Sequence, residues 1–140
     1  MSLFNVFDIT ASAMQAQSVR LNVTASNLAN ADSVMSSNGE TYRARHPVFQ
    51  TVLGERLLDR SGAAPGGVRV AGIVESQAPL RREYRPDHPA ADESGYVSLP
   101  NVSVVEEMAN MIAASRSYQS NVEVFNASKQ MVQQTLSLGK

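Results

Sequence analysis

The chain of 140 residues contains no cysteine and no tryptophan, and aromatic residues make up only 6% of it. The missing thiols exclude disulfide bonds and thiolate metal sites. No apolar run reaches the length of about 18 residues that is needed to cross a bilayer. The first residues also lack a basic segment followed by an apolar stretch. We therefore expect no cleavable secretory signal.

Catalytic and nucleic-acid signatures are equally scarce. The two histidines, His46 and His88, each precede a proline, which is typical of extended loops. No nucleophile elbow, zinc-protease motif, phosphate loop or dinucleotide fingerprint occurs. The net charge of −1 gives no electrostatic reason to expect nucleic acid or an acidic membrane as a partner. We therefore expect no enzymatic activity, no cofactor and no metal site.

Charged residues in the middle of the chain leave two alternatives open. The acidic segment 87–93 could hold a cation weakly, but a solvated loop is the interpretation we favour. Three arginines flank Tyr84 and could contact nucleic acid. Because the acidic segment follows at once, a salt-bridged or interface patch is the better interpretation.

An apolar repeat of seven residues is present at both ends of the chain. A period of 3.5 residues is typical of helices that bury a seam against other helices. The N-terminal repeat consists of Phe7, Met14, Leu21 and Leu28. The C-terminal repeat consists of Val104, Met111, Tyr118, Phe125 and Val132, with Met108, Val122 and Leu136 at companion positions. Both ends are therefore predicted to be helical.

The predicted N-terminal helix, from residue 3 to about residue 30, carries almost no charge. Arg20 is the only charged residue between Ile9 and Asn30. A second apolar row, on a different face, consists of Ile9, Ala13, Ala16 and Val23. An ordinary surface helix has charged residues on its solvent face, so this helix is predicted to be covered on several sides. Because the chain is too short to cover it alone, we expect other chains to do so.

The remaining segments complete a prediction of fold class: mainly α with a small β-rich insertion. Residues 41–99 contain short β-leaning runs broken by glycine and proline, which predict an irregular antiparallel module. Ser103 and Glu106 have the spacing of a capping box and predict the start of the C-terminal helix. The two terminal helices are expected to form a coiled-coil-like bundle. We therefore predict that the chain divides into three segments: 1–36 with the N-terminal helix, 37–100 with the β module, and 101–140 with the C-terminal helix.

Several blocks of the sequence resemble flagellar rod and hook proteins. Residues 21–34, LNVTASNLANADSV, are similar to the asparagine-rich signature near the N-terminus of that family. The opening segment, the stretch YRARHPVFQ and the segment from Leu99 to Val132 resemble its proximal-rod members in matching order. The threonine that often follows the signature is absent, and Ala31-Asp32-Ser33 stand there instead. The short middle also resembles the proximal type more than the longer distal-rod or hook proteins.

The resemblance implies a structural subunit of the flagellar basal-body rod that transmits torque from the motor to the distal rod and hook. It would be exported by the flagellar type III apparatus without signal cleavage and polymerise in the periplasm as part of a helical filament. The implied partners are other proximal and distal rod proteins, the adaptor protein that joins the rod to the MS ring, and that ring itself. No nucleic acid and no direct membrane insertion are implied.

The apolar repeats and the asparagine-rich motif together give the predicted assembly interface. Its motif residues are Ser26, Asn27, Leu28 and Asn30. Asn27 and Asn30 share a helical face, where buried amides fix the register between helices, or where asparagine only loosens a helix end. Arg20 and Arg116 are candidates for inter-subunit ion pairs, or are merely solvated. The alternative function is a helical adaptor or a binding module like a secretion chaperone.

Overall fold

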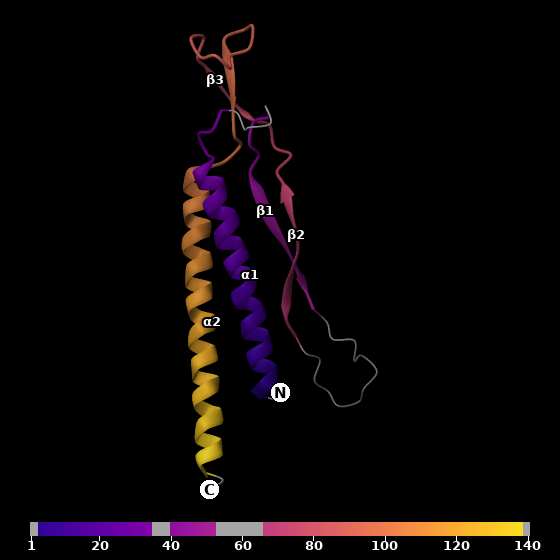
Figure 1. Cartoon of the computed structure of the whole chain (residues 1–140), viewed down its shortest axis with the longest axis vertical. Coiled ribbons are helices and arrows are strands. Elements are labelled where there is room, and N and C mark those ends of the chain that lie inside the picture. The colour runs from indigo at the N-terminus through magenta and orange to yellow at the C-terminus, as the bar shows by residue number, and fades with distance from the viewer. Residues whose placement is uncertain (1–2, 35–39, 53–65, 139–140) are drawn as a thin grey trace.

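The computed structural model describes residues 3–34, 40–52 and 66–138. Two long helices bracket four short strands in chain order (Figure 1). The elements are α1 (Leu3–Ala29), β1 (Arg45–Thr51), β2 (Val68–Glu75), β3 (Arg81–Tyr84), β4 (Tyr96–Leu99) and α2 (Val104–Leu138). The strands form two antiparallel pairs, β1 with β2 and β3 with β4. The predicted fold class, mainly helical with a small antiparallel insertion, is confirmed.

The two helices lie side by side and run in opposite directions (Figure 1). Near the start of α1, the ring of Phe7 packs edge-on against the ring of Phe125, with the centroids 5.0 Å apart. Further along, the Arg20 guanidinium donates a hydrogen bond of 2.8 Å to the side-chain oxygen of Asn110. With 35 residues against 27, α2 is longer than α1 by about 12 Å at 1.5 Å per residue.

The start of α2 follows from its capping residue. The Ser103 hydroxyl accepts a hydrogen bond from the backbone N–H of Glu106, and the Ser103 carbonyl accepts one of 2.9 Å from Glu107. Glu106 and Glu107 in the first turn also suit the positive end of the helix dipole. The predicted helix start is confirmed.

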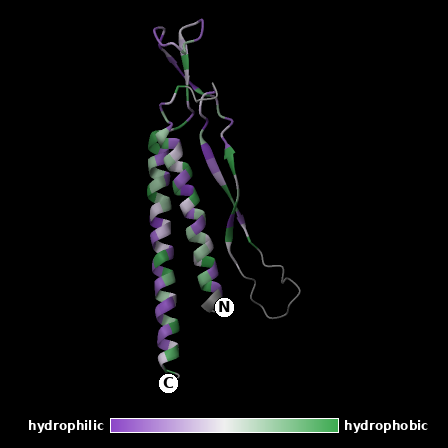
Figure 2. Cartoon of the chain, in the orientation of Figure 1, coloured by the Kyte–Doolittle hydropathy of each residue, from purple (hydrophilic) through white to green (hydrophobic). Residues whose placement is uncertain are grey.

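Hydrophobic residues recur along the length of both helices instead of gathering at one end of either (Figure 2).

The β1–β2 hairpin is a thin ribbon that folds back along α1, on the other side from α2 (Figure 1). The backbone N–H of Val68 donates a hydrogen bond of 3.2 Å to the Ser12 hydroxyl on α1. The second apolar row of α1 is covered there, and Ala16 and Val23 are buried. The chain therefore covers part of this row itself, and the expectation that other chains help to cover the helix stays a prediction. The chain covers this part because the β1–β2 hairpin lies along the helix, whereas the β3–β4 hairpin lies beyond it (Figure 1).

The small core lies where the helices meet the strands. Ala31, Ala44 and Val102 form a buried cluster, against which Tyr42 packs. In the neighbouring β4, Val97 and Leu99 are also buried. These are small or medium-sized side chains, so the hydrophobic area buried at this junction is modest. Most of the elongated structure depends on the contacts of α1 with α2 and with the hairpin.

Candidate assembly surface

Asn27 is the most completely enclosed polar side chain of the predicted interface, with 0% of its surface exposed. Its amide nitrogen donates to the carbonyl of Arg45 over 2.8 Å. Its amide oxygen accepts from the backbone N–H of Arg45 and from the Tyr42 hydroxyl, each over 2.9 Å. The side chain thus pairs with both backbone groups of the first residue of β1. Within the chain, Asn27 joins the end of α1 to the start of the hairpin.

The other motif residues lie around these three hydrogen bonds of Asn27, which we call the Asn27 clamp. Ser26 is half-buried, and its hydroxyl is 3.3 Å from the Tyr42 hydroxyl. Asn30 is half-buried and donates its amide to the Ser26 carbonyl over 2.8 Å, which closes the last turn of α1. The asparagine-rich motif therefore shapes the junction between helix and strand. Sequence reasoning missed this intramolecular role because Asn27 and its strand partner Arg45 are 18 residues apart.

The predicted apolar seam of α1 is half-buried throughout. Its members Phe7, Met14, Leu21 and Leu28 share one face because residues seven apart lie within about 20° of one another on a helix. The contact of Phe7 with Phe125 shows that this face is turned towards α2. Substantial surface remains accessible along the seam.

The predicted seam of α2 is more open than that of α1. Four members are half-buried: Met111, Val122, Phe125 and Val132. Four are exposed: Val104, Met108, Tyr118 and Leu136. The buried residues of α2 are instead Glu107, Ala114 and Ser128, on a row with the same seven-residue spacing. Small and polar side chains thus form the closest contact of α2 with its own chain, while much of the apolar repeat remains accessible.

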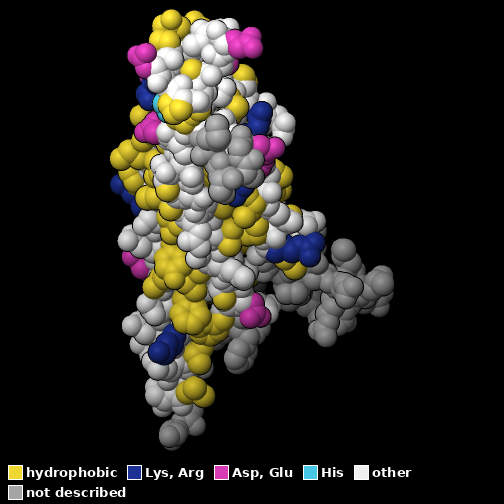
Figure 3. All heavy atoms as spheres, turned by 45° about the horizontal axis from the view of Figure 1, so that its top comes forward, with side chains coloured by type: hydrophobic (Ala, Val, Ile, Leu, Met, Phe, Trp, Pro, Cys, Tyr) yellow, Lys and Arg dark blue, Asp and Glu magenta, His cyan; other side chains and the backbone are white. Residues whose placement is uncertain are grey.

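Exposed apolar residues on α2 extend beyond the predicted set. Val105 is 78% exposed and Ile112 is 55% exposed. They are seven residues apart, which is the signal that could have revealed them. Hydrophobic side chains are visible along the helical part of the molecule, whereas charged side chains gather mainly around the β module (Figure 3). Such a contiguous apolar surface typically marks a site of protein contact.

The two arginines that the sequence singled out differ in their surroundings. Arg20 is half-buried and bonded to Asn110 of α2, so within the chain it joins the two helices. Arg116 is exposed on α2 and forms no ion pair with the residues that the structure describes. Of the two, Arg116 is the one left free to bind another molecule.

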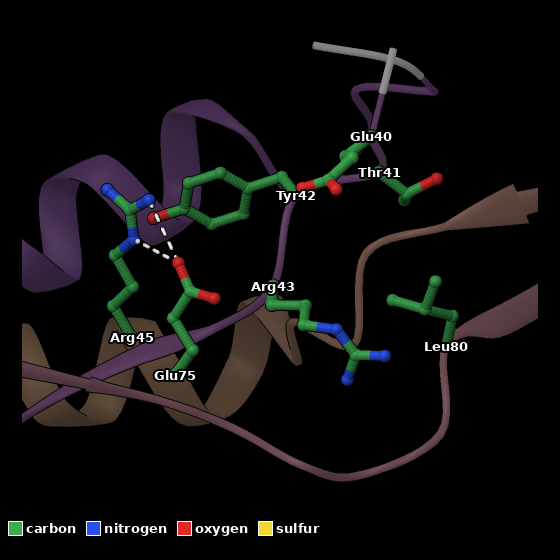
Figure 4. Close-up of a pocket in the computed structure, with 7 residues that line it drawn as sticks. All are labelled: Glu40, Thr41, Tyr42, Arg43, Arg45, Glu75 and Leu80. Atoms are coloured by element: carbon green, nitrogen blue, oxygen red, sulfur yellow. Dashed lines mark hydrogen bonds and ion pairs between the residues drawn. The ribbon is translucent and has the colours of Figure 1, made fainter. Parts of the chain in front are cut away.

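A hollow of about 420 Å³ lies between the loop before β1 and the end of β2. Figure 4 shows Arg45 and Glu75 pointing towards one another at one side of it, with an ion-pair distance of 3.0 Å. The Arg45 guanidinium also lies over the Tyr42 ring, 5.3 Å from its centroid. Arg43 donates hydrogen bonds to the carbonyls of Ser76 and Ala78. These charged side chains interact with the chain itself, so they hold the β1–β2 hairpin in place.

The β3–β4 hairpin forms a separate tip. Its turn contains Gly95 at a φ of 78°, and a Cβ there would come within 2.9 Å of the Tyr84 ring. Tyr84 packs edge-on against Tyr96, and the Arg82 guanidinium lies over the Tyr96 ring. The Asp92 carboxylate accepts backbone N–H bonds from Tyr96 and Ser94 and a side-chain bond from Arg82. The arginines near Tyr84 are thus engaged in ion pairs, as the favoured interpretation of the sequence predicted.

The tip should loosen in acid. The backbone bond from Tyr96 is the largest of the causes that lower the pKa of Asp92 below its ordinary value of 3.8. A lowered pKa means that ionised Asp92 stabilises the turn above 3.8 and that this contribution is lost as the pH falls through the lowered value. The Tyr96 amide resonance should therefore shift in acid with a midpoint below pH 3.8. In the Asp92→Asn variant this transition should be absent, and a midpoint above 3.8 in the unmodified chain would contradict the arrangement.

Within the described residues no helix has the length and apolar character of a membrane span. The same residues contain no group of three histidine, aspartate or glutamate side chains that could hold a metal ion. The prominent features of the described surface are thus apolar helix faces and ion-paired strands.

Comparison with known proteins agrees with this geometry. The family described as "Flagella basal body rod protein" matches residues 7–34, and the family described as "Flagellar basal body rod FlgEFG protein C-terminal" matches residues 93–138. The flagellar basal-body rod protein FlgC of Escherichia coli O157:H7 is 56% identical over the full length of both chains. The FlgC proteins of Salmonella typhimurium and Yersinia enterocolitica are 55% and 53% identical, again over both full lengths. The chain therefore belongs to the FlgC family of flagellar basal-body rod proteins and is a structural subunit of that rod.

Proposed function

We propose that this subunit is part of the proximal rod and polymerises there through its two terminal helices. The observation that carries the proposal is the exposed apolar surface of α2, above all Val105, Met108 and Ile112. A helix that worked only within one chain would present charged and polar residues on this side. The proposed contact surface also includes the accessible parts of the two predicted seams. Many such helix contacts in parallel resist twisting, which is what torque transmission to the distal rod and hook requires.

The three segments have different tasks in this proposal. Segments 1–36 and 101–140 form the assembly core, and segment 37–100 stiffens it. The β1–β2 hairpin contributes by bracing α1, and the β3–β4 tip projects beyond the helices (Figure 1). The partners are other proximal and distal rod proteins, the adaptor that joins the rod to the MS ring, and the MS ring itself. No catalytic step is part of this function.

The proposed location is the periplasmic part of the basal body. The subunit would arrive through the flagellar type III export apparatus, without cleavage of a signal peptide. An assembly helix that is exported unfolded need not carry a solvent-compatible face, since it becomes covered as soon as it is incorporated. This agrees with the apolar surface of α2 and with the scarcity of charge on α1.

The proposal predicts that Met108→Glu abolishes incorporation without unfolding the chain. Met108 is exposed in the single chain, so glutamate there costs little in the folded monomer. In a packed contact, an unpaired charge costs about 3 kcal/mol and weakens association by about two orders of magnitude. Swimming of a strain that carries only the variant, and the amount of the chain in isolated basal bodies, measure the effect.

The matched control is Ser120→Glu, which adds the same charge at an exposed polar position on another side of α2, about 120° around the helix from Met108. It should leave incorporation and swimming intact. Normal rods built from Met108→Glu would refute assembly through this surface. Recovery of the unmodified chain only as a soluble complex with another exported protein, and never in basal bodies, would favour the chaperone-like alternative.

A further inference from the structure

One exposed face of α1 has no charge over almost its whole length. Its residues Ala11, Gln15, Ser18, Asn22 and Ala25 are all exposed and follow one another at intervals of three and four. This spacing is that of a seam between packed helices. The contacts with α2 and with the hairpin lie on other sides of α1. We call these five residues the neutral face of α1.

A groove of about 510 Å³ flanks the neutral face, between α1 and β2. Its apolar lining comes from Val19 and Val23 of α1 and from Ile73 of β2, which is exposed although it lies beside the helix. The ion pair of Arg45 and Glu75 forms one end of the groove. Asn22 belongs both to the groove and to the neutral face, so the two form one continuous surface.

The chain also carries a protruding apolar surface, which is the shape that fills a groove. Val105, Met108 and Ile112 form an exposed apolar ridge on α2, with the spacing i, i+3 and i+7 by which a helix anchors itself in a groove. We call these three residues the α2 ridge. Val105 and Ile112 each stand two positions from a buried residue, Glu107 and Ala114, and two positions on a helix turn the side chain by about 200°. The ridge therefore faces away from its own α1.

We propose that the α2 ridge of a second copy of this chain packs on the neutral face of α1 and into the groove beside β2. This inference rests on the proposed function and specifies which surfaces meet. The ridge of one molecule cannot enter the groove of the same molecule, because the ridge is on the far side of α2 and α1 lies between α2 and the hairpin (Figure 1). The contact joins two different surfaces, so every copy that makes it still has one of the two surfaces available and the contact continues from copy to copy.

The arrangement accounts for the composition of α1. In an array whose copies all point the same way, the incoming α2 runs antiparallel to the α1 that receives it, as its own α2 does. Each α1 is then covered by two α2 helices and one hairpin, which leaves no side for charged residues. Small residues on the neutral face permit a close helix approach.

Cysteine pairs test this contact in assembled rods, because the chain contains no cysteine of its own. We expect the double variant Asn22→Cys with Ile112→Cys to give a ladder of disulfide-linked oligomers when basal bodies are isolated and oxidised. The yield should exceed that of a control pair, Tyr84→Cys with Ile112→Cys, by about tenfold or more, because only the first pair is held in proximity. Asn22 and Tyr84 are both exposed, so a difference in yield cannot come from one partner being buried.

Each single variant distinguishes the proposed contact from a symmetric one. Ile112→Cys alone should give no dimer, because the ridge meets α1 and not another ridge. Dimers of Ile112→Cys alone, or rods that contain the double variant but show no ladder, would overturn the inference while leaving the rod function intact. Absence of the unmodified chain from basal bodies would instead refute the proposed function. Ser18→Cys replaces Asn22→Cys if the latter is not incorporated, and it should give the same ladder.

Discussion

Replacing Asn27 with alanine is expected to lower the free energy of unfolding by about 3 kcal/mol. The substitution removes three hydrogen bonds, leaves the N–H and C=O groups of Arg45 without their Asn27 partner, and leaves the Tyr42 hydroxyl only the Ser26 hydroxyl at 3.3 Å. Since Asn27 is fully buried, water cannot replace the amide without a rearrangement of the junction. Urea unfolding followed by circular dichroism measures the loss.

Two further variants make this prediction specific. Tyr42→Phe removes only one of the three bonds and should cost about 1 kcal/mol. Asn22→Ala, on the same helix but exposed, should change the free energy of unfolding by less than about 0.5 kcal/mol. If Asn27→Ala were no more destabilising than Asn22→Ala, the amide would not be the connection between α1 and β1 that its hydrogen bonds indicate.

Loss of the clamp should also be visible locally. With the amide absent, Arg45 loses its direct hydrogen bonds to α1, while the bond of 2.8 Å from the Ala44 N–H to the Asn101 side chain still ties the neighbouring residue to the segment before α2. The Arg45 amide should therefore exchange its hydrogen faster, while amides in the middle of α2 should keep their protection. A uniform increase along the whole chain would indicate global destabilisation instead.

The sequence allowed the architecture to be predicted because both of its strongest signals are local. Apolar residues seven apart predicted the two helices, and Ser103 with Glu106 predicted the start of α2, which is confirmed. The family could likewise be recognised from blocks in matching order. These inferences need no knowledge of what a segment packs against, and this is why they were available from one sequence.

What the sequence did not reveal is which surface each helix face meets. A scarcity of charge on α1 indicated cover on several sides, but it could not show that the chain's own hairpin lies on one of them. The pairing of Asn27 with Arg45 depends on how the chain returns after α1, which no local pattern encodes. On α2 the apolar repeat drew attention away from Glu107, Ala114 and Ser128, which are the buried residues. Periodicity locates a helix, whereas its partners are decided by the rest of the fold.

Ala114→Asp is expected to destabilise the chain most among substitutions on α2. Ala114 has 0% of its surface exposed and lies on the buried side of the helix, towards α1. Its small side chain allows the two backbones to approach closely. Aspartate would add volume where none is free and would bury a charge, and such an unpaired charge costs about 3 to 5 kcal/mol. We expect the two helices to separate and the chain to be lost from basal bodies.

Ala113→Asp is the matched control, because it makes the same substitution one residue earlier on an exposed position of α2. Both changes cost the same in helix propensity, about 0.5 kcal/mol, so the difference between them isolates the contact between the helices. The free energies of unfolding should differ by at least about 3 kcal/mol. Equal stability of the two variants would mean that α1 and α2 are not packed against each other through Ala114. The surfaces left for a neighbouring copy would then have to be reassigned, because the position of the α2 ridge depends on which side of α2 faces α1.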